Sequence, residues 1–425
     1  MFILYDFIYL VFVIFYLPVF FLKKKKYPGF RMRLGILPKD LNLESPIWIH
    51  AVSVGEAQAV RGLVEGLRVQ YPGKKLVIST VTPTGNKIVR GIARPVDFVF
   101  YFPLDLSFIV RKVIARIKPS LFIIAETEIW PNIISYISAQ AIPILVVNGR
   151  ISDSSFKGYY YLKFILKPLL NKVNIFCMQT EQDAHRLVCL GVDPDKIKIT
   201  GNVKFDLKDY SGSNSSCLPA GKGLKNRLGI EEQGKILVCG STHPKEEEII
   251  LGAYIKLLDE IKGLRLIIAP RHPERSNEIS GLIKKFGLQS QLFSSLNSAI
   301  YNSQKKSVII VDSVGQLLNF YAIADIVYIG GSLIKHGGQN ILEPALFAKP
   351  ILFGPHMFNF RNIADLFLTN QAAVLVHNKS EFQDKVKYYL ANSQAAAELG
   401  RCAKSLISKN QGATQKTLEY IKLLY

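Results

Sequence analysis

The chain has 425 residues, of which 49% are hydrophobic and 20% are charged, and its formal net charge at pH 7 is +20. This length exceeds what one hydrophobic core usually holds, and the composition excludes an extensively disordered protein. The large positive charge requires an anionic partner, and nucleic acid, anionic lipid and phosphorylated substrates all meet that requirement.

The N-terminal residues have the composition of a membrane anchor. Residues 1–22 are apolar except for Asp6, and lysines follow at positions 23–26. About 20 apolar residues are enough to cross a bilayer as a helix, and lysines beside such a span stay on the cytoplasmic side. A cleaved signal peptide carries its positive charge before the apolar run instead. We therefore predict an uncleaved transmembrane anchor over residues 1–22, with the rest of the chain on the cytoplasmic face of the inner membrane and the lysines against anionic lipid. A peripheral amphipathic helix is the alternative, but the segment has no polar face.

Both halves of the chain have the pattern of buried parallel strands joined by helices. Short apolar runs alternate with helical segments, as crossover connections require. The predicted strands are residues 47–52, 75–79, 121–125, 144–148 and 175–178 in the first half, and 235–239, 264–269, 308–311, 326–329, 350–353 and 373–376 in the second.

A Ser- and Gly-rich stretch at residues 207–222 interrupts this pattern and predicts a linker. The fold class is therefore α/β, with two Rossmann-like, doubly wound domains facing a cleft. We place the N-terminal domain at residues 23–206, the C-terminal domain at 223–398 and a C-terminal helix at 399–425.

The cysteines and histidines do not indicate a metal centre. The five cysteines are scattered without a C-x-x-C pair, and none of the seven histidines belongs to an H-E-x-x-H motif. An odd number of dispersed cysteines is typical of reduced, buried thiols in the cytosol. The sequence therefore predicts no zinc site.

Polar residues at the ends of predicted strands are candidates for chemistry, because ligands of open α/β sheets gather there. Glu56 follows the first strand and is either a general base or an acid in the first turn of a helix. Glu126 and Glu128 follow the third strand, and one of them is explained equally well as a capping acid. Lys204 precedes the linker, where it is either a surface lysine or a cation that balances charge on a leaving phosphate.

A glycine-rich segment at residues 330–344 is the strongest motif of the second half. Its glycines allow backbone N–H groups to approach a phosphate at the start of the next helix, where Glu343 is placed to accept hydrogen bonds from ribose hydroxyls. Arg271 suits a phosphate or a base carbonyl, whereas His243 and His272 are expected to be neutral structural residues. A loop that only turns the chain is the alternative to this nucleotide-sugar site.

Taken in order, these motifs resemble those of the Kdo (3-deoxy-D-manno-octulosonic acid) transferases of Gram-negative lipopolysaccharide synthesis, a family of GT-B glycosyltransferases. The resemblance covers essentially the whole chain. It includes the strings S-V-G-E, T-P-T-G, E-T-E-I-W-P-N, G-N-V-K-F-D, G-S-T-H, P-R-H-P-E-R, G-G-Q-N-I-L-E-P and G-P-H-M-F-N-F.

The resemblance implies a specific reaction and specific site residues. The family moves Kdo from CMP-Kdo onto a lipid A precursor, with inversion, without a metal ion and without a cofactor. Its general base matches Glu56, and its transition-state stabilisers match Glu126 and Lys204. Its CMP contacts match Pro270, Arg271, Val314, Gly315, Gln316, Asn340, Ile341, Leu342 and Glu343.

Two positions depart from the family pattern, and other functions are to be weighed. Gln339 stands where the family often has histidine, and Gln316 where it often has glutamate, so neither side chain titrates here.

A transferase or epimerase acting on a UDP-sugar is the alternative enzyme, and a membrane-anchored scaffold without activity is the alternative from another class. Nucleic acid is not an expected partner, because the basic charge lacks a recognisable binding module.

Overall fold

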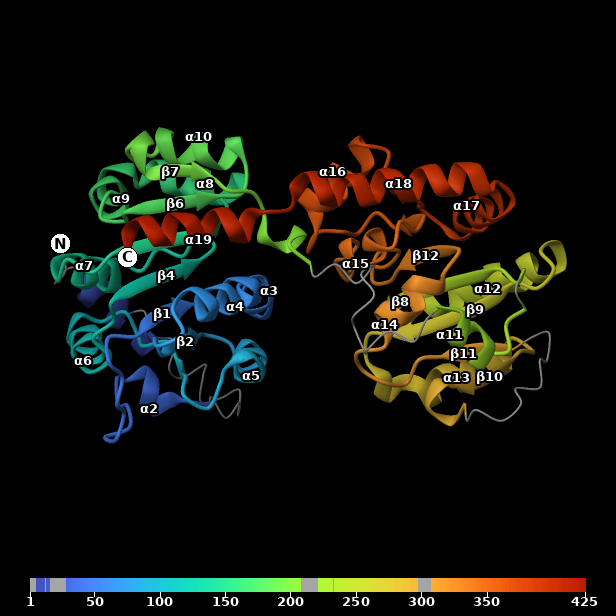
Figure 1. Ribbon diagram of the computed structural model, residues 1–425, viewed down its shortest axis with the longest axis horizontal. Coiled ribbons are helices and arrows are strands. Elements are labelled where there is room, and N and C mark those ends of the chain that lie inside the picture. The colour runs from blue at the N-terminus through green and yellow to red at the C-terminus, as the bar shows by residue number, and fades with distance from the viewer. Residues whose placement is uncertain (1–4, 12, 16–27, 208–220, 232, 297–306) are drawn as a thin grey trace. The chain divides into compact units, whose positions relative to one another are not determined.

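The computed structural model describes residues 5–11, 13–15, 28–207, 221–231, 233–296 and 307–425. The chain divides into two compact units (Figure 1). Unit 1 contains residues 1–206 and 410–425, and unit 2 contains residues 207–409. The linker predicted at 207–222 lies mostly outside the described residues.

Unit 1 is built on a seven-stranded, wholly parallel sheet with the strand order β3-β2-β1-β4-β5-β6-β7. Its strands are β1 (Ile47–His50), β2 (Leu76–Thr80), β3 (Phe98–Tyr101), β4 (Leu121–Ala125), β5 (Ile144–Gly149), β6 (Ile175–Met178) and β7 (Ile197–Ile199). Alternate residues of one strand serve two cores: Trp48 belongs to one apolar cluster, and Ile47 and Ile49 belong to another. Because both faces are buried, the strands are apolar throughout.

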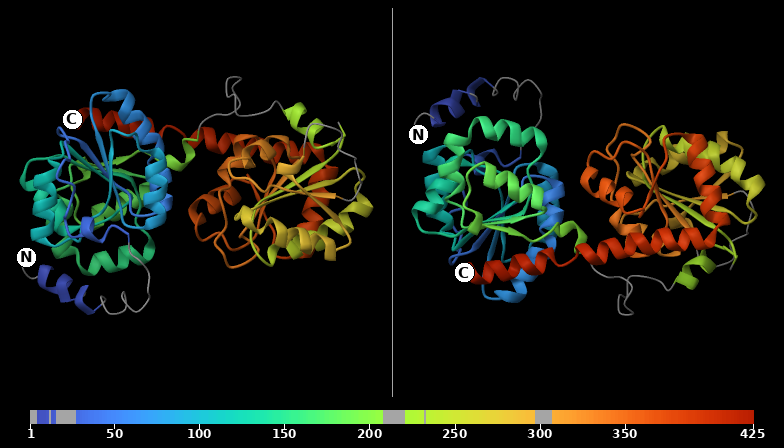
Figure 2. Two further views of the ribbon diagram at one scale, coloured as in Figure 1. Left: turned by 90° about the horizontal axis from the view of Figure 1, so that it is seen from below. Right: turned by 90° about the horizontal axis from the view of Figure 1, so that it is seen from above.

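The helices of unit 1 cover both faces of this sheet (Figure 2). They are α2 (Phe30–Arg33), α3 (Val54–Ala59), α4 (Arg61–Gln70), α5 (Pro83–Ile92), α6 (Ser107–Ile117), α7 (Pro131–Ala139), α8 (Asp153–Tyr161), α9 (Lys163–Leu170) and α10 (Glu181–Cys189), with the short 3-10 helices η1 (Pro194–Lys196) and η2 (Val203–Phe205).

Unit 2 has a second seven-stranded parallel sheet with the strand order β10-β11-β9-β8-β12-β13-β14. Its strands are β8 (Ile236–Thr242), β9 (Arg265–Pro270), β10 (Gln289–Leu292), β11 (Ser307–Ile310), β12 (Ile326–Ile329), β13 (Ile351–Phe353) and β14 (Val374–Leu375). The strand order reverses at β8, which pairs with β9 on one side and β12 on the other. Ligands of doubly wound sheets bind at such a reversal, outside the carboxyl ends of the strands.

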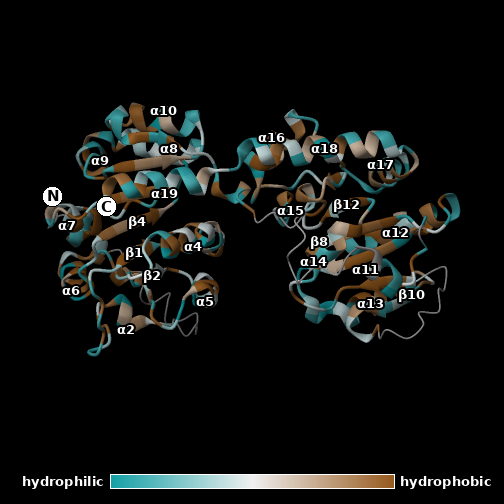
Figure 3. Ribbon diagram, viewed as in Figure 1, coloured by the Kyte–Doolittle hydropathy of each residue, from teal (hydrophilic) through white to brown (hydrophobic). Residues whose placement is uncertain are grey.

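The strands of unit 2 are apolar like those of unit 1, and its helices carry both hydrophobic and hydrophilic residues (Figure 3). Its helices are α11 (Gly221–Arg227), α12 (Glu246–Glu260), α13 (Ser276–Lys285), α14 (Leu317–Ile323), α15 (Leu342–Leu346), α16 (Arg361–Thr369), α17 (Lys379–Ala391) and α18 (Ser393–Asn410), with η3 (Pro273–Arg275) and η4 (Phe293–Ser295).

The last helix of the chain, α19 (Ala413–Leu424), belongs to unit 1. The C-terminal residues predicted as one helix over 399–425 lie in α18 and α19, which are separated at Gly412 with φ 99°. Leu418 and Ile421 of α19 are part of an apolar core of unit 1. The Asp206 carboxylate accepts hydrogen bonds from the backbone N–H groups of Gly412 (2.6 Å) and Thr414 (2.5 Å), so it fixes the start of α19.

The structure does not support the transmembrane anchor predicted over residues 1–22. Among the described residues, no helix is both long and apolar enough to cross a membrane. Residues 5–11 and 13–15 are helical, whereas 1–4, 12 and 16–22 lie outside the described residues, as does the lysine run at 23–26. Asp6 accepts hydrogen bonds from the Asn132 side chain (2.7 Å) and the Ser107 backbone (3.1 Å). The one charged side chain of the expected span is therefore bound to unit 1, where its hydrogen-bonding needs are met.

Candidate functional site

Unit 1 gathers charged side chains at the carboxyl ends of β1, β4 and β5. Glu126, directly after β4, has φ 55°, and Asn148, at the end of the neighbouring β5, has φ 54°. Left-handed backbone is uncommon for residues other than glycine, and such strain concentrates at functional sites. The Asn148 side-chain oxygen accepts a hydrogen bond from the Val203 backbone (3.2 Å) and so positions the turn that carries Lys204.

Glu56 lies in the first turn of α3 and is only 6% exposed. Its carboxylate accepts hydrogen bonds from the Val52 backbone N–H (2.7 Å) and the Ser53 hydroxyl (2.8 Å), while Ser53 caps the same helix. This is the reciprocal arrangement of a capping box. Glu56 therefore has a capping role, and burial still raises the pKa of its carboxyl above the ordinary value, opposed by these hydrogen bonds.

The three residues assigned to catalysis by resemblance lie in one electrostatic neighbourhood. Burial lowers the pKa of Lys204, and the nearby charges of Glu126 and Glu56 act in the opposite direction. Glu126 forms an ion pair with Arg150, with 3.2 Å between Oε2 and Nε. The structure thus brings Glu56, Glu126 and Lys204 together, and it adds Arg150, which the sequence indicated only as a cation at a strand end.

Glu128 belongs to the same cluster. Burial raises the pKa of Glu128 to about 7, and the charges of Glu56 and Glu126 add to the effect. The sequence left open which acid of the Glu126 and Glu128 pair points toward a ligand. In the structure both contribute to the charge around Glu56.

The raised pKa of Glu128 predicts a pH-dependent effect on stability. The folded state binds the proton more tightly than the unfolded chain does, so this group destabilises the fold as pH rises from about 4.5 through about 7. We expect Glu128→Gln to unfold at a higher temperature than the parent near pH 8 but at the same temperature near pH 4. Tryptophan fluorescence measures this, since Trp48 and Trp130 both lie in unit 1.

The matched control for that experiment is Glu181→Gln, which changes an exposed first-turn acid of α10 in the same unit. A stabilisation by Glu128→Gln that is equal at both pH values would contradict the prediction, because it would not depend on the proton.

In unit 2, a buried carboxylate organises the glycine-rich segment after β12. Glu246, the first residue of α12, is fully buried and accepts five hydrogen bonds of 2.5 to 3.3 Å. The donors are the Tyr328 hydroxyl and the backbone N–H groups of His243, Gly331, Ser332 and Leu333. Burial raises the pKa of Glu246, and the hydrogen bonds oppose that change. Sequence reasoning missed this residue, because an acid at a helix start is usually exposed.

This arrangement corrects the expected use of the glycines. The backbone N–H of Gly331 donates to Glu246, that of Gly330 to the Gly240 carbonyl and that of Gly338 to the Gly331 carbonyl. These amides are therefore occupied and are not directed at a ligand. A Cβ on Gly330 would lie 2.4 Å from the Ser241 carbonyl oxygen, so glycine is required there by close packing.

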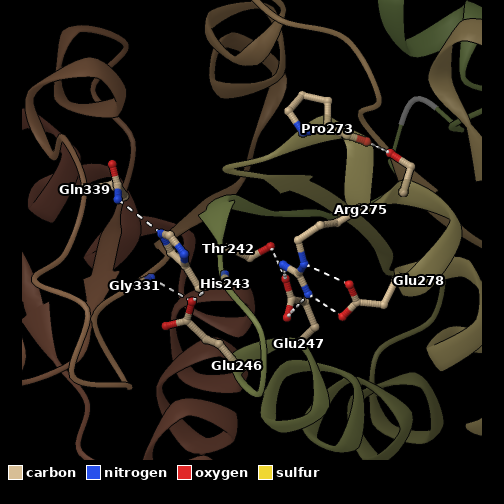
Figure 4. A network of polar contacts seen from close by, with 10 residues as sticks. Thr242, His243, Glu246, Glu247, Pro273, Arg275, Glu278, Gly331 and Gln339 are labelled. Carbon is tan, nitrogen blue, oxygen red and sulfur yellow. Dashed lines mark hydrogen bonds and ion pairs between the residues drawn. The ribbon is translucent and has the colours of Figure 1, made fainter. Parts of the chain in front are cut away.

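A second buried acid, Glu247, holds the segment after β9. It accepts hydrogen bonds from the Thr242 hydroxyl (3.0 Å) and from Arg275 (2.9 Å), and Arg275 also pairs with Glu278 (2.9 Å). Figure 4 shows Arg275 between the two carboxylates. The ends of β8 and β9 are thus connected through charged side chains.

The residues matched to CMP contacts lie in unit 2, at the end of β9 and in the segments after β9, β11 and β12. Glu343 accepts a hydrogen bond from the Asn340 side chain (3.1 Å); burial raises its pKa, and the charge of Arg271 acts in the opposite direction. Gln316 accepts one from Asn319 (2.9 Å). The remaining matched residues are Pro270 at the end of β9, the exposed Val314, Gly315 with φ 86°, and the buried Ile341 and Leu342.

Comparisons with known proteins match the chain to one family. A family model described as 3-Deoxy-D-manno-octulosonic-acid transferase (kdotransferase) matches residues 28–207. The 3-deoxy-D-manno-octulosonic acid transferase of Haemophilus influenzae is 35% identical over 377 residues, covering 88% of this chain and 86% of that protein. A bifunctional glycosyltransferase/methyltransferase of Fusobacterium nucleatum is 37% identical over 366 residues, covering 85% of this chain and 55% of that protein.

The fold is shared with solved glycosyltransferases. A glycosyltransferase from Rickettsia africae has a TM-score of 0.56 and 16% identity, covering 90% of this chain and 99% of that one. At this identity the likeness shows the fold alone, which is two parallel-sheet α/β domains resembling GT-B enzymes. From the family model and the long matches to its relatives, the chain belongs to the family of 3-deoxy-D-manno-octulosonic acid transferases and is an enzyme of the glycosyltransferase class.

Proposed function

We propose that this enzyme moves Kdo from CMP-Kdo onto a lipid A precursor in lipopolysaccharide synthesis, with inversion and without a metal ion. The observation that carries the proposal is the cluster of Glu56, Glu126 and Lys204 at the strand ends of unit 1. A buried carboxylate with a raised pKa beside a half-buried cation is suited to proton abstraction from a hydroxyl.

The chemical step follows from these groups. An acceptor hydroxyl gives its proton to Glu56 as its oxygen attacks the anomeric carbon of the donor sugar. The bond between that carbon and the phosphate oxygen breaks, and CMP leaves with the electron pair. Attack opposite the leaving group inverts the configuration. In this proposal Lys204 and Glu126, whose charges act on each other, stabilise the charges that develop in the transition state.

Side-chain cations support transfer without a metal ion. CMP leaves as a phosphate monoester, so no diphosphate needs a divalent clamp. Lys204 and Arg150 in unit 1 and Arg271 in unit 2 supply positive charge. Within the described part of the chain, no group of three or more His, Cys, Asp or Glu side chains is arranged to hold a metal ion.

An exposed apolar surface on unit 1 is an argument for a lipid acceptor. It is formed by side chains around the junction of α8 and α9, and we call it the α8–α9 surface: Tyr160, Tyr161, Leu162, Phe164 and Ile165. Phe164 is 94% exposed and Tyr161 is 86% exposed. Contiguous apolar exposure of this kind marks an interaction site, and aromatic side chains favour the membrane interface.

Basic side chains beside the α8–α9 surface fit an anionic membrane. Lys157 and Lys167 are exposed, and Lys163 Nζ lies 5.8 Å from the centroid of the Tyr160 ring. Each such cation contributes about 1 kcal/mol of attraction near an anionic surface. We therefore place the enzyme on the cytoplasmic surface of the inner membrane, with the α8–α9 surface against the lipid.

Vesicle binding tests this placement. Replacing Tyr161 and Phe164 together by serine should weaken binding to vesicles containing anionic lipid by about 10²- to 10⁴-fold, because each of the two aromatic side chains is worth roughly 1.5–3 kcal/mol when buried. Val69→Ser is the matched control, since Val69 is 84% exposed on α4 of the same unit. Equal vesicle binding by the double variant and the parent would exclude the α8–α9 surface as the contact.

The reaction itself is tested by incubating the full chain in detergent with CMP-Kdo, a tetraacylated lipid A precursor and EDTA. A gain in lipid mass of one or more Kdo units, read by mass spectrometry, is the expected result. An unchanged lipid, beside an active transferase of the family as control, would overturn the proposal. Stabilisation of the protein by UDP in preference to CMP would instead indicate a different donor.

A further inference from the structure

Three histidines converge where the strand order of unit 2 reverses. His243 follows β8, His272 follows β9 and His336 lies after β12. The ring centroids of His243 and His336 are 3.7 Å apart, and those of His243 and His272 are 6.2 Å apart. The loops after β8 and β12 flank the reversal, which is where a doubly wound sheet binds its ligand. The imidazoles are therefore at the ligand end of the sheet.

The three rings differ in exposure in a way that suits a binding site. His243 is only 3% exposed, whereas His272 and His336 are exposed. The Gln339 amide nitrogen lies 3.3 Å from Nε2 of His243, and Figure 4 shows the His243 ring turned toward that amide. A neutral imidazole accepts a hydrogen bond from the amide N–H. After a flip of the amide, its oxygen accepts from a protonated ring, so Gln339 serves both protonation states of His243.

The charges around His243 are mainly positive. Burial, and after it the neighbouring His336, His272, Arg271 and Arg275, together lower the pKa of His243 to about 4. The charge of Arg275 is balanced by Glu247 and Glu278. The Glu246 carboxylate meets the backbone N–H of His243 and is bound by four other donors.

Arg271 has a backbone contact to the Thr242 carbonyl (3.0 Å) but no ion pair to any residue that the structure describes. An arginine in such a place commonly binds a carboxylate or a phosphate. The imidazole pair and Arg271 thus form a group of donors without an ion-paired acid among the described residues, although the charge of Arg271 also acts on the buried Glu343.

We propose that His243, His336 and Arg271 bind the carboxylate of the donor sugar, and that the imidazole pair takes up a proton from solvent when this anion binds. The inference rests on the proposed function, since an ulosonic acid donor carries one carboxylate in addition to its phosphate. A bound anion favours the charged form of His243, which without it is disfavoured by burial and by neighbouring cations. Donor binding is then coupled to protonation in this chain, and Gln339 accommodates the change.

Calorimetric titration of the full chain tests the proposal. CMP and CMP-Kdo are titrated separately, without acceptor, near pH 6.5 in two buffers of different ionisation enthalpy that contain neither phosphate nor carboxylate. The difference between the buffers gives the number of protons taken up. We expect uptake with CMP-Kdo and none with CMP. Uptake with CMP alone would assign the histidines to the phosphate and overturn the carboxylate assignment.

A variant separates binding from folding. His336→Asn changes an exposed side chain and should weaken CMP-Kdo binding by about 10- to 100-fold, the worth of one hydrogen bond to a charged group, while changing CMP binding less than about twofold. Its proton uptake should fall as well. His377→Asn is the control, because His377 is exposed in the same unit and pairs with Glu381 (2.9 Å).

The outcomes also distinguish this inference from the function on which it rests. Binding of CMP and CMP-Kdo without proton uptake, or equal weakening of both by His336→Asn, would overturn the carboxylate site alone. Binding of neither ligand by the parent protein would overturn the proposed function and this inference together.

Discussion

Replacing Glu56 by glutamine is expected to lower turnover by roughly 10²- to 10⁴-fold, the range for loss of a general base. Glutamine keeps the size of the side chain and its ability to cap α3, because a capping box accepts Gln at the same position. It cannot accept the proton of an attacking hydroxyl. The measurement is the rate of Kdo transfer under saturating substrates, with the melting temperature recorded in parallel.

Loss of the capping role of Glu56 is the alternative explanation for a lower turnover. Stability and pH-dependence measurements separate loss of the cap from loss of the base. Loss of a cap costs about 1 kcal/mol of stability and leaves the pH dependence of the rate unchanged. Loss of a base removes the rise of the rate with pH that ionisation of Glu56 produces, and since burial raises the pKa of Glu56, that rise lies above the usual carboxyl range. Near-normal turnover by the glutamine variant would remove Glu56 from the role of base. Glu181→Gln again serves as the control.

Glu246→Ala is expected to destabilise unit 2 by about 3–5 kcal/mol, the usual cost of breaking a buried charged network by removing one partner. The substitution removes the acceptor of the Tyr328 hydroxyl and of four backbone N–H groups. The N–H of Leu333 also contacts the Tyr328 hydroxyl (3.3 Å), whereas those of His243, Gly331 and Ser332 have no second partner among the described residues. Because four of the five donors come from β12 and the segment that follows it, CMP binding should be lost along with stability.

Both tryptophans lie in unit 1, so unfolding of unit 2 is best followed by urea titration with circular dichroism. Hydrogen exchange then locates the change, with loss of protection expected at Gly331, Ser332 and Leu333. Glu248→Ala is the matched control, since Glu248 is an exposed acid in the same first turn of α12. If the two variants were equally stable, the network around Glu246 would not hold the segment in place.

The sequence indicated the central strands well and the sheet edges poorly. β4, β6 and β12 have the bounds that their apolar runs predicted, because a strand buried on both faces must be apolar throughout. The strands that were missed are β3, β7 and β10, and each lies at the edge of its sheet. An edge strand has one neighbour and less burial, so its residues, such as Gln289 and Gln291 of β10, need not be apolar.

The site was predictable only in part. Motif positions indicated Glu56, Glu126 and Lys204 through resemblance, and the strand-end rule placed them near one another. The role of Glu246 could not be predicted, because its partners Gly331, Ser332 and Leu333 lie 85 to 87 positions later in the chain. A periodic pattern in the sequence relates residues that are close along the chain. The hydrogen-bond donors of a buried carboxylate come from residues that are distant in sequence, and such a pattern does not indicate them.

The membership of α19 in unit 1 has a consequence for how the protein is made. Residues 413–424 leave the ribosome after all of unit 2, yet Leu418 and Ile421 complete an apolar core of unit 1. Hydrogen bonds hold α19 against this core at both ends of the helix. The Tyr425 hydroxyl lies 2.7 Å from Ser120 Oγ, and Asp206 binds the backbone at the start of the helix. Domains usually fold in the order of their synthesis. Here the core of the first unit is completed only after the second unit has been translated, and until then the first unit has an exposed apolar face.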